Sequence, residues 1–316
     1  MEKTIRQQFA DTMLEVGQKD PKLVVLVGDI SHFILQPFAK ACPGRYYNVG
    51  ICEPTIMSMA AGMAKSGLVP VVHTIAPFLI ERSFEQMKLD FCYQGLGGNI
   101  VTLGSAFDYS NLGCSHHCYG DFALMKTLPN AEIVYPGSAV EWDALFRQAY
   151  TRHSLKLFRL PGKSHGEKFS GSEIRLGSGR KVTDGQDLTL IATGPQLRSA
   201  LDARPALSDM GFETEILYIH TIRPLDTELI LSSVRKTKKV LVIEEHMRSG
   251  GLGDEVLRGV RDLESVRFVS LSIPDQFVTQ YGSYEEHCAR LGLSSQGIVQ
   301  AVRDSFKGVP AWKSTF

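Results

Sequence analysis

The sequence predicts an α/β protein of two domains, each built on a mainly parallel sheet with helices on both faces. Short apolar runs rich in valine and leucine, such as residues 23–27 and 188–192, recur along the chain, and stretches of helical periodicity separate them. Runs of this length are typical of strands buried on both faces, and their alternation with helices favours a parallel sheet. The 316 residues are sufficient for two hydrophobic cores.

The first domain, residues 1–165, is expected to begin with a helix over residues 3–16 that Gly17 ends. Apolar runs predict its main strands, at residues 23–27, 69–73, 99–103, 132–135 and 155–159. Helical periodicity predicts helices after Glu53 and over residues 80–93 and 140–151.

Residues 166–185 are rich in Gly, Ser, Lys and Glu and lack periodicity, so we expect them to link the two domains. Residues 186–316 form the expected second domain, which is the smaller of the two. Its strands are expected at residues 188–192, 214–218, 240–243 and 267–271, and its helices at residues 196–208, 253–262 and 294–304.

The composition restricts the possible functions. Lys and Arg total 34, as do Asp and Glu, so no basic excess favours nucleic acid or an anionic membrane as a partner. The polar start of the chain, the absence of a run long enough to span a membrane, and six scattered cysteines favour a soluble cytoplasmic protein with reduced thiols.

The stretch from Tyr46 to Ala64 begins as a short extended run and continues as a helix rich in small residues. Glu53 stands at the junction, and Pro54 follows it in the first turn, where proline removes no helical hydrogen bond. A carboxylate at a helix N-terminus is stabilised by the helix dipole, so Glu53 alone is consistent with a simple cap. The small residues along this helix would let another backbone approach closely.

Two further loops follow predicted strands, where ligands bind in folds of this kind. The first contains Phe78, which could stack on a planar ring or pack in the core. The second, from Gly113 to Asp121, holds His116 and His117 between two cysteines. Structural zinc sites use two separated ligand pairs, so we expect a surface or active-site loop here, and no metal ligand in the chain.

Other motifs carry less information. Residues 250–253 contain three glycines and are interpreted as the entry to a helix. A dinucleotide-binding fingerprint would need correctly spaced glycines in the first strand–helix–strand unit. The sequence contains no Walker loop, no G-x-S-x-G elbow and no H-E-x-x-H motif.

Taken together, these stretches resemble the thiamine-diphosphate family that includes transketolase and 1-deoxyxylulose-5-phosphate synthase. Family members carry a glutamate in a segment like residues 48–53, an aromatic residue ahead of a helix like residues 82–86, and a Gly-x-Thr-His-Gln motif like residues 113–117. Further similar stretches lie in the second domain, at residues 190–194, 223–226, 242–246, 273–277 and 291–293. The resemblance covers nearly the whole chain.

The chain also departs from the family pattern. Thr55 replaces the usual histidine two residues after the glutamate, and Leu112 replaces an acid that usually contacts a sugar hydroxyl. One extra residue lies between Phe78 and Arg82, so the stacking role could belong to Leu79, or to its neighbour Ile80, instead of Phe78.

The resemblance implies roles for particular side chains. Glu53 is implied to be catalytic, with its carboxyl bonded to the pyrimidine N1′ of thiamine diphosphate, and His116 is implied to be catalytic and to bind substrate. The further implied cofactor contacts are Phe78, Leu79, Arg82 and Asp29. The further implied substrate contacts are Ser115, Arg159 and His73.

The resemblance further implies a missing partner. The family's diphosphate-binding domain has no counterpart in these residues, so the chain is similar to the pyrimidine-binding and C-terminal domains alone. We therefore expect an N-terminal diphosphate-binding transketolase subunit as partner, which would hold Mg²⁺. A homodimer of this chain would form the centre of a heterotetramer with two copies of each subunit.

Three functions are weighed from the sequence. The first is the small subunit of a two-chain transketolase, which transfers a two-carbon ketol unit from a ketose, expected to be phosphorylated, to an aldose. The second lies within thiamine chemistry: the β subunit of a 2-oxo acid dehydrogenase, or an enzyme similar to 1-deoxyxylulose-5-phosphate synthase. The third is a non-catalytic scaffold subunit, which the presence of Glu53 disfavours.

Overall fold

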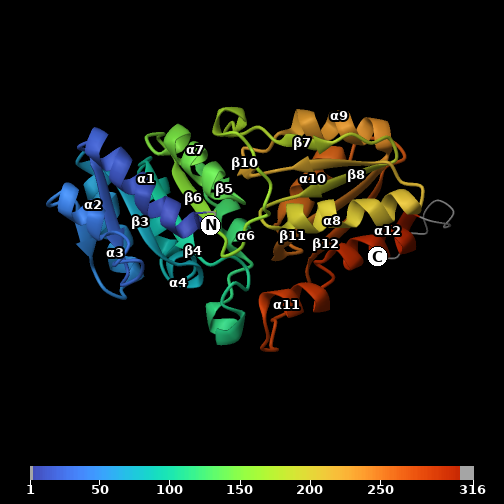
Figure 1. Cartoon of the computed structure of the whole chain (residues 1–316). Coiled ribbons are helices and arrows are strands. Elements are labelled where there is room, and N and C mark those ends of the chain that lie inside the picture. The colour runs from blue at the N-terminus through green and yellow to red at the C-terminus, as the bar shows by residue number, and fades with distance from the viewer. Residues whose placement is uncertain (1–2, 307–316) are drawn as a thin grey trace.

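The computed structural model describes residues 3–306 and contains two sheets side by side, each covered by helices (Figure 1). A seven-stranded sheet forms the N-terminal part, and a five-stranded sheet forms the C-terminal part. In each sheet the strands pair in parallel except for one strand at an edge. The two-domain α/β fold class predicted from the sequence is therefore confirmed.

The first sheet has the strand order β10-β5-β6-β4-β3-β1-β2. Its strands are β1 (Leu23–Val27), β2 (Tyr46–Asn48), β3 (Val69–Ile75), β4 (Gly98–Leu103), β5 (Ala131–Val134), β6 (Leu155–Leu160) and β10 (Thr221–Arg223). Every residue of β1, β4, β5 and β6 is buried, which explains why these strands are largely apolar in the sequence. Because β1 to β6 are parallel, the loops after their carboxyl ends gather at one edge.

Helices cover both faces of this sheet (Figure 1). They are α1 (Ile5–Lys19), α2 (Gln36–Ala41), α3 (Glu53–Lys65), α4 (Ala76–Ile80), α5 (Phe84–Gln86), the π-helix η1 (Met87–Cys92), α6 (Asp121–Lys126) and α7 (Ala139–Ala149). Helix α1 continues through Gly17, where the sequence predicted an end, because this glycine serves a helix contact. A Cβ atom on Gly17 would lie 2.4 Å from the ring of Phe38 in α2.

The single helix predicted over residues 80–93 is three short segments, α4, α5 and η1. Helix α4 starts earlier, with Pro77 in its first turn. The chain turns after Ile80, where the hydroxyl of Ser83 donates to the carbonyl oxygen of Leu79. Single π-helical turns such as η1 are frequent near functional sites. The break leaves residues 81–83 free of helical constraint at the carboxyl edge of the sheet.

The second sheet has the strand order β12-β11-β8-β9-β7. Its strands are β7 (Arg180–Thr183), β8 (Leu188–Ala192), β9 (Thr214–Tyr218), β11 (Lys239–Met247) and β12 (Arg267–Ile273). Its helices are α8 (Gln196–Asp209), α9 (Thr227–Thr237), α10 (Leu252–Val260), α11 (Tyr284–Arg290) and α12 (Ser295–Phe306). Strand β7 lies within the stretch expected to link the domains, and it pairs antiparallel with β9. No helix within residues 3–306 is long and apolar enough to cross a bilayer.

The two parts share a packed junction. Strand β10 belongs to the second half of the chain but extends the first sheet by pairing antiparallel with β5. The guanidinium of Arg223 donates to the carbonyl oxygens of Lys126 and Leu128, at 3.1 and 3.2 Å. One hydrophobic cluster contains Ile133 from β5 and Ile222 from β10, so the core continues across the junction.

The glycines at residues 250–253 shape the entry of α10, as the sequence predicted. The buried carboxylate of Glu244 accepts hydrogen bonds from the backbone N–H groups of Leu252 and Gly253, at 2.5 and 2.7 Å. Burial raises the pKa of Glu244 to about 7, although these two hydrogen bonds favour its charged form. A Cβ atom on Gly251 would lie 2.4 Å from that carboxylate, so only glycine fits this position.

Replacing Gly251 with alanine is therefore expected to break the cap of α10. We expect a loss of at least about 2 kcal/mol in the free energy of unfolding, because a buried carboxylate would lose its donors. The matched control is Gly259→Ala in the same helix, where the new Cβ would have only an ordinary contact at 3.7 Å. That change should be neutral or stabilise by up to about 1 kcal/mol. Urea denaturation measures both, and equal effects of the two changes would contradict the cap.

Candidate functional site

The candidate site lies at the carboxyl edge of the first sheet, where Glu53 begins helix α3. Its side chain is 2% exposed, and its Oε2 atom accepts a hydrogen bond of 3.2 Å from Nη1 of Arg82. The other oxygen, Oε1, is buried and has no partner among the residues that the structure describes. A buried oxygen without a donor is costly and uncommon, so Glu53 has the geometry of a group that receives a donor from a ligand.

Phe78 and Arg82 form the next part of the site. The guanidinium of Arg82 lies 4.1 Å from the centre of the Phe78 ring, which is partly exposed. Leu79 and Ile80, by contrast, are fully buried in the core. Of the three residues considered for stacking, only Phe78 keeps a face for a ligand, and we do not retain Leu79 in the site.

His116 lies against this pair. Its ring centre is 5.1 Å from that of Phe78 and 6.1 Å from that of Tyr109, in edge-on arrangements. Its Nδ1 atom is 3.0 Å from the hydroxyl oxygen of Ser115, and both residues belong to the 3₁₀ turn η3 (Cys114–His116). The backbone turns there at Gly113, whose φ of 77° suits a residue without a side chain.

The neighbouring His117 points elsewhere. It is buried, its ring centre lies 5.8 Å from that of His287 in α11, and burial together with that histidine lowers its pKa to about 4. The two adjacent histidines therefore serve different surroundings. Within residues 3–306 no group of three or more His, Cys, Asp or Glu side chains is arranged to hold a metal ion.

Asp29 lies at the end of β1, on the exposed side of the same edge. Its Oδ1 atom accepts a hydrogen bond of 3.0 Å from the side chain of Asn48, whose own oxygen accepts from the backbone N–H groups of Asp29 and Gly50. These bonds tie the loop after β1 to the turn that leads into Glu53. Asp29 thus shapes the approach to the site, and a contact with cofactor stays a prediction.

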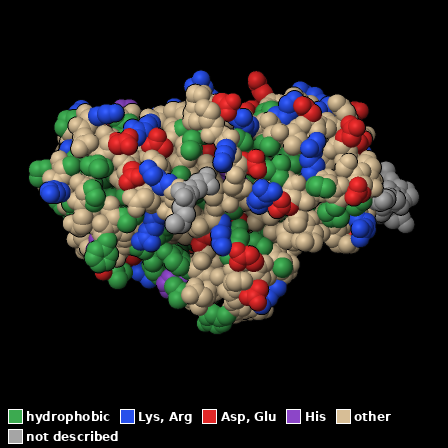
Figure 2. All heavy atoms as spheres, in the orientation of Figure 1, with side chains coloured by type: hydrophobic (Ala, Val, Ile, Leu, Met, Phe, Trp, Pro, Cys, Tyr) green, Lys and Arg blue, Asp and Glu red, His purple; other side chains and the backbone are tan. Residues whose placement is uncertain are grey.

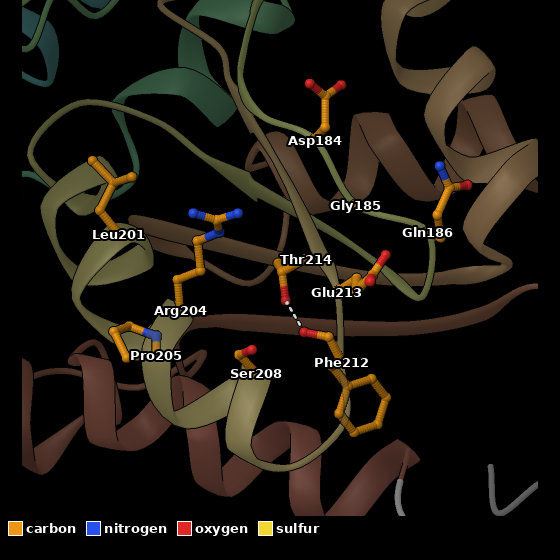
Figure 3. A pocket seen from close by; sticks show the side chains of 10 residues that line it. All are labelled: Asp184, Gly185, Gln186, Leu201, Arg204, Pro205, Ser208, Phe212, Glu213 and Thr214. Carbon is orange, nitrogen blue, oxygen red and sulfur yellow. Dashed lines mark hydrogen bonds between the residues drawn. The ribbon is translucent and has the colours of Figure 1, made fainter.

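A separate cavity of about 690 Å³ lies in the second part, between α8 and the amino-terminal ends of β8 and β9 (Figure 3). Side chains of Arg204, Ser208 and Phe212 line it, and the hydroxyl of Thr214 donates to the carbonyl oxygen of Phe212. None of the residues that the sequence assigned to the site takes part. It lies at the strand ends opposite to those where ligands bind in such sheets.

Comparison with known proteins agrees with this site. Residues 1–164 match the family described as the pyrimidine-binding domain of transketolase, and residues 177–298 match the transketolase C-terminal domain. The chain belongs to the transketolase family. The family resemblance inferred from the sequence is thereby confirmed.

Relatives within the transketolase family differ in length. One of the two subunits of an apulose-4-phosphate transketolase of Phocaeicola vulgatus is 30% identical over 96% of this chain and 97% of its own length. A 6-deoxy-6-sulfo-D-fructose transketolase subunit of a Clostridium species is 28% identical over 95% of this chain and 94% of its own. The 1-deoxy-D-xylulose-5-phosphate synthase of Halothermothrix orenii is 32% identical, but this chain spans only 44% of its length.

Solved structures of transketolases have the same fold. A structure described as a split-gene transketolase, an inactive beta4 tetramer, is 30% identical and superimposes with a TM-score of 0.86, covering 96% of this chain and 98% of the other. A transketolase from Pichia stipitis shares only the fold, at 15% identity and a TM-score of 0.78, with 95% of this chain matching 45% of it.

Two substrate contacts suggested by the transketolase resemblance are not available in the structure. His73 is fully buried in β3, and burial lowers its pKa to about 4. Its Nδ1 atom lies 2.8 Å from the carbonyl oxygen of Val101, and its Nε2 atom lies 2.8 Å from the hydroxyl of Ser31. With both ring nitrogens engaged, His73 supports the loop after β1 and does not face a substrate.

Arg159 is likewise fully buried. Its Nε atom lies 3.0 Å from the carboxylate of Asp121, and its Nη2 atom donates to the carbonyl oxygens of Cys118 and Glu245. The guanidinium also lies 4.7 Å from the ring centre of Tyr135. These contacts join β6 to the His116 loop and to β11 of the second sheet, so Arg159 braces the junction and does not grip a substrate phosphate.

Sequence reasoning missed Asp108 and Tyr109, which lie in the loop between β4 and the His116 turn. Together with Gly162 and Lys163 they line a cavity of about 440 Å³ at the carboxyl ends of β4 and β6. Their position directly after a predicted strand was the one available signal.

Replacing Arg159 with methionine tests its role as a brace. We expect a loss of about 3–5 kcal/mol in the free energy of unfolding, because Asp121 would become an unpaired buried charge. The double change Arg159→Met with Asp121→Asn removes that charge and should recover part of the loss. Denaturant unfolding measures both variants. A single variant with wild-type stability but weakened substrate binding would contradict the brace and restore a substrate contact.

Proposed function

We propose that this chain is the pyrimidine-binding and C-terminal subunit of a two-chain transketolase that uses thiamine diphosphate. The enzyme would transfer a two-carbon ketol unit from a ketose, expected to be phosphorylated, to an aldose. The observation that carries the proposal is the buried Glu53 with its unpartnered oxygen beside Phe78, Arg82 and His116. The full-length relatives named as transketolase subunits support the same function.

The residues present fit the pyrimidine half of the cofactor. Oε1 of Glu53 is buried and lacks a donor, and a ring nitrogen that carries a proton would supply one. The partly exposed ring of Phe78 offers an apolar face of the right kind for a planar heterocycle. We assign the diphosphate and its Mg²⁺ to a partner chain, because relatives of this length are named as subunits.

The roles of this chain's own groups follow from their geometry. Bound thiamine diphosphate supplies the electron sink for breaking and forming carbon–carbon bonds. Glu53 would hold a proton at the pyrimidine N1′, and Arg82 fixes its carboxylate by bonding the oxygen that faces away from the ligand. His116, supported by Ser115 and held between two rings, would donate to substrate oxygens as their charge changes.

A function similar to 1-deoxyxylulose-5-phosphate synthase is the second candidate, because one such synthase is 32% identical over 87% of this chain. That activity consumes a 2-oxo acid and releases carbon dioxide, whereas ketol transfer between sugars releases none. Assays of the reconstituted pair with sugar phosphates and with pyruvate therefore separate the two. Carbon dioxide release without ketol transfer would favour the second candidate.

We also propose a cytoplasmic location for the complex. The six cysteines of the chain are all unpaired in the structure, which is usual for a reducing compartment.

Glu53→Gln should keep the shape of the site but remove the shared proton. Stability should change little, because the swap is nearly isosteric and leaves no unpaired charge. Turnover of the variant reconstituted with its partner should fall about 10²–10⁴-fold at saturating cofactor. The matched control is Glu228→Gln, an exposed acid in the first turn of α9. If Glu53 were only a helix cap, turnover would stay near normal and both variants would lose similar, small amounts of stability.

Assembly supplies a second test. Figure 2 shows hydrophobic side chains gathered on the face near α3 and α4, whereas charges of both signs intermingle elsewhere. Met59 of α3 is 36% exposed and Leu89 of η1 is 43% exposed, and these two elements pack together. We propose that this face forms a homodimer, which two partner chains flank in a heterotetramer.

Met59→Glu should therefore weaken self-association, because it places a charge in a desolvated interface. Leu257→Glu is the matched control, since Leu257 is 45% exposed on α10, away from that face. Sedimentation of each variant with and without the partner measures the assembly. A dimer unaffected by Met59→Glu, or a monomer that is fully active alone, would contradict the proposed arrangement.

A further inference from the structure

The loop between β4 and the His116 turn has an unusual backbone. Ala106 has a φ of 29°, a conformation that costs energy for a residue with a side chain. Strain of this kind persists only where the surroundings hold the backbone in place. The contacts of this loop identify what holds it.

Asp108 makes the principal contacts. Its Oδ2 atom accepts three hydrogen bonds, from the backbone N–H of Ser105 at 2.6 Å, the hydroxyl of Ser105 at 3.1 Å and the backbone N–H of Gly162 at 2.7 Å. Gly162 follows β6, so one carboxylate joins the loops after two neighbouring strands. A Cβ atom on Gly162 would lie 3.2 Å from Cγ of Asp108, which explains the close approach of the two loops.

The bonds of Asp108 fix both sides of the His116 turn. Tyr109, the next residue, has its ring against Gly104 and 6.1 Å from the ring centre of His116. On the other side, the backbone N–H of Cys118 donates to the carbonyl oxygen of Ala106 at 2.7 Å. A loop held by Asp108 therefore sets the position of the turn that carries the histidine.

The charges around Asp108 are mixed. Burial, together with the nearby carboxylate of Glu245, raises its pKa to about 6. Lys3, Arg6 and Lys163 line the adjacent cavity with it. At neutral pH the carboxylate is the stronger acceptor for the three donors, because hydrogen bonds to a charged group are shorter and stronger.

We propose that Asp108 is a positioning residue of the enzyme, which clamps the loops after β4 and β6 and thereby holds His116 against Phe78. This inference deepens the proposed function and rests on the role given there to His116. Asp108 acts through Tyr109 and the turn, without contact with the reacting atoms.

The test compares Asp108→Ala with Asp108→Asn. The asparagine oxygen can still accept from the two backbone N–H groups, whereas alanine removes every bond of the clamp. In the full chain, amide hydrogen exchange over residues 104–118 should rise about tenfold or more in the alanine variant and little in the asparagine variant. In the reconstituted enzyme, the alanine variant should lose about 10- to 100-fold in kcat with KM nearly unchanged, and asparagine should restore most of it.

Asp209→Ala, at the exposed end of α8, is the matched control and should change neither readout. Unchanged exchange in Asp108→Ala would show that the clamp does not hold the loop and would overturn the inference. Faster exchange with normal kcat would overturn the link to His116. If the wild-type pair had no ketol-transfer activity, the proposed function would fail, while the exchange measurement would still decide the clamp.

Discussion

The arrangement of the whole molecule depends on one buried cation, Arg159. Its guanidinium contacts Asp121 in the first part, the carbonyl oxygen of Cys118 beside the His116 turn, and the carbonyl oxygen of Glu245 in the second sheet. A charge that is fully removed from water is tolerated only with such partners in place. The relative position of the two sheets, and of the loop that carries His116, is therefore coupled to one side chain.

The candidate site follows from parallel topology. Loops after neighbouring parallel strands meet at one edge, so segments far apart in sequence form a continuous series of contacts. Glu53 bonds Arg82, Arg82 lies over Phe78, Phe78 meets His116, and His116 meets Tyr109. Each contact orients the next group, and the series leaves one carboxylate oxygen of Glu53 without a donor. A site organised in this way can bind one face of a planar ligand.

The sequence predicted the fold well because buried parallel strands produce short apolar runs, and it identified the stretches that hold Glu53, Phe78 and His116. It could not predict which side chains at that edge point inward. His73 and Arg159 have residue types suited to binding sugars and phosphates, but the pairing of their strands places both in the interior. Long-range pairing also hid strand β10, whose three residues return to the first sheet and carry no periodicity of their own.

The account's central claim is that Glu53 shares a proton with the pyrimidine ring of thiamine diphosphate. The most direct measurement is ¹⁵N NMR of cofactor labelled at N1′ and bound to the reconstituted pair of subunits. With the wild-type chain, the N1′ resonance should have the shift of a nitrogen that carries or shares a proton. With Glu53→Gln it should move to the position of an unprotonated ring nitrogen. The same N1′ shift in both complexes would contradict the claim.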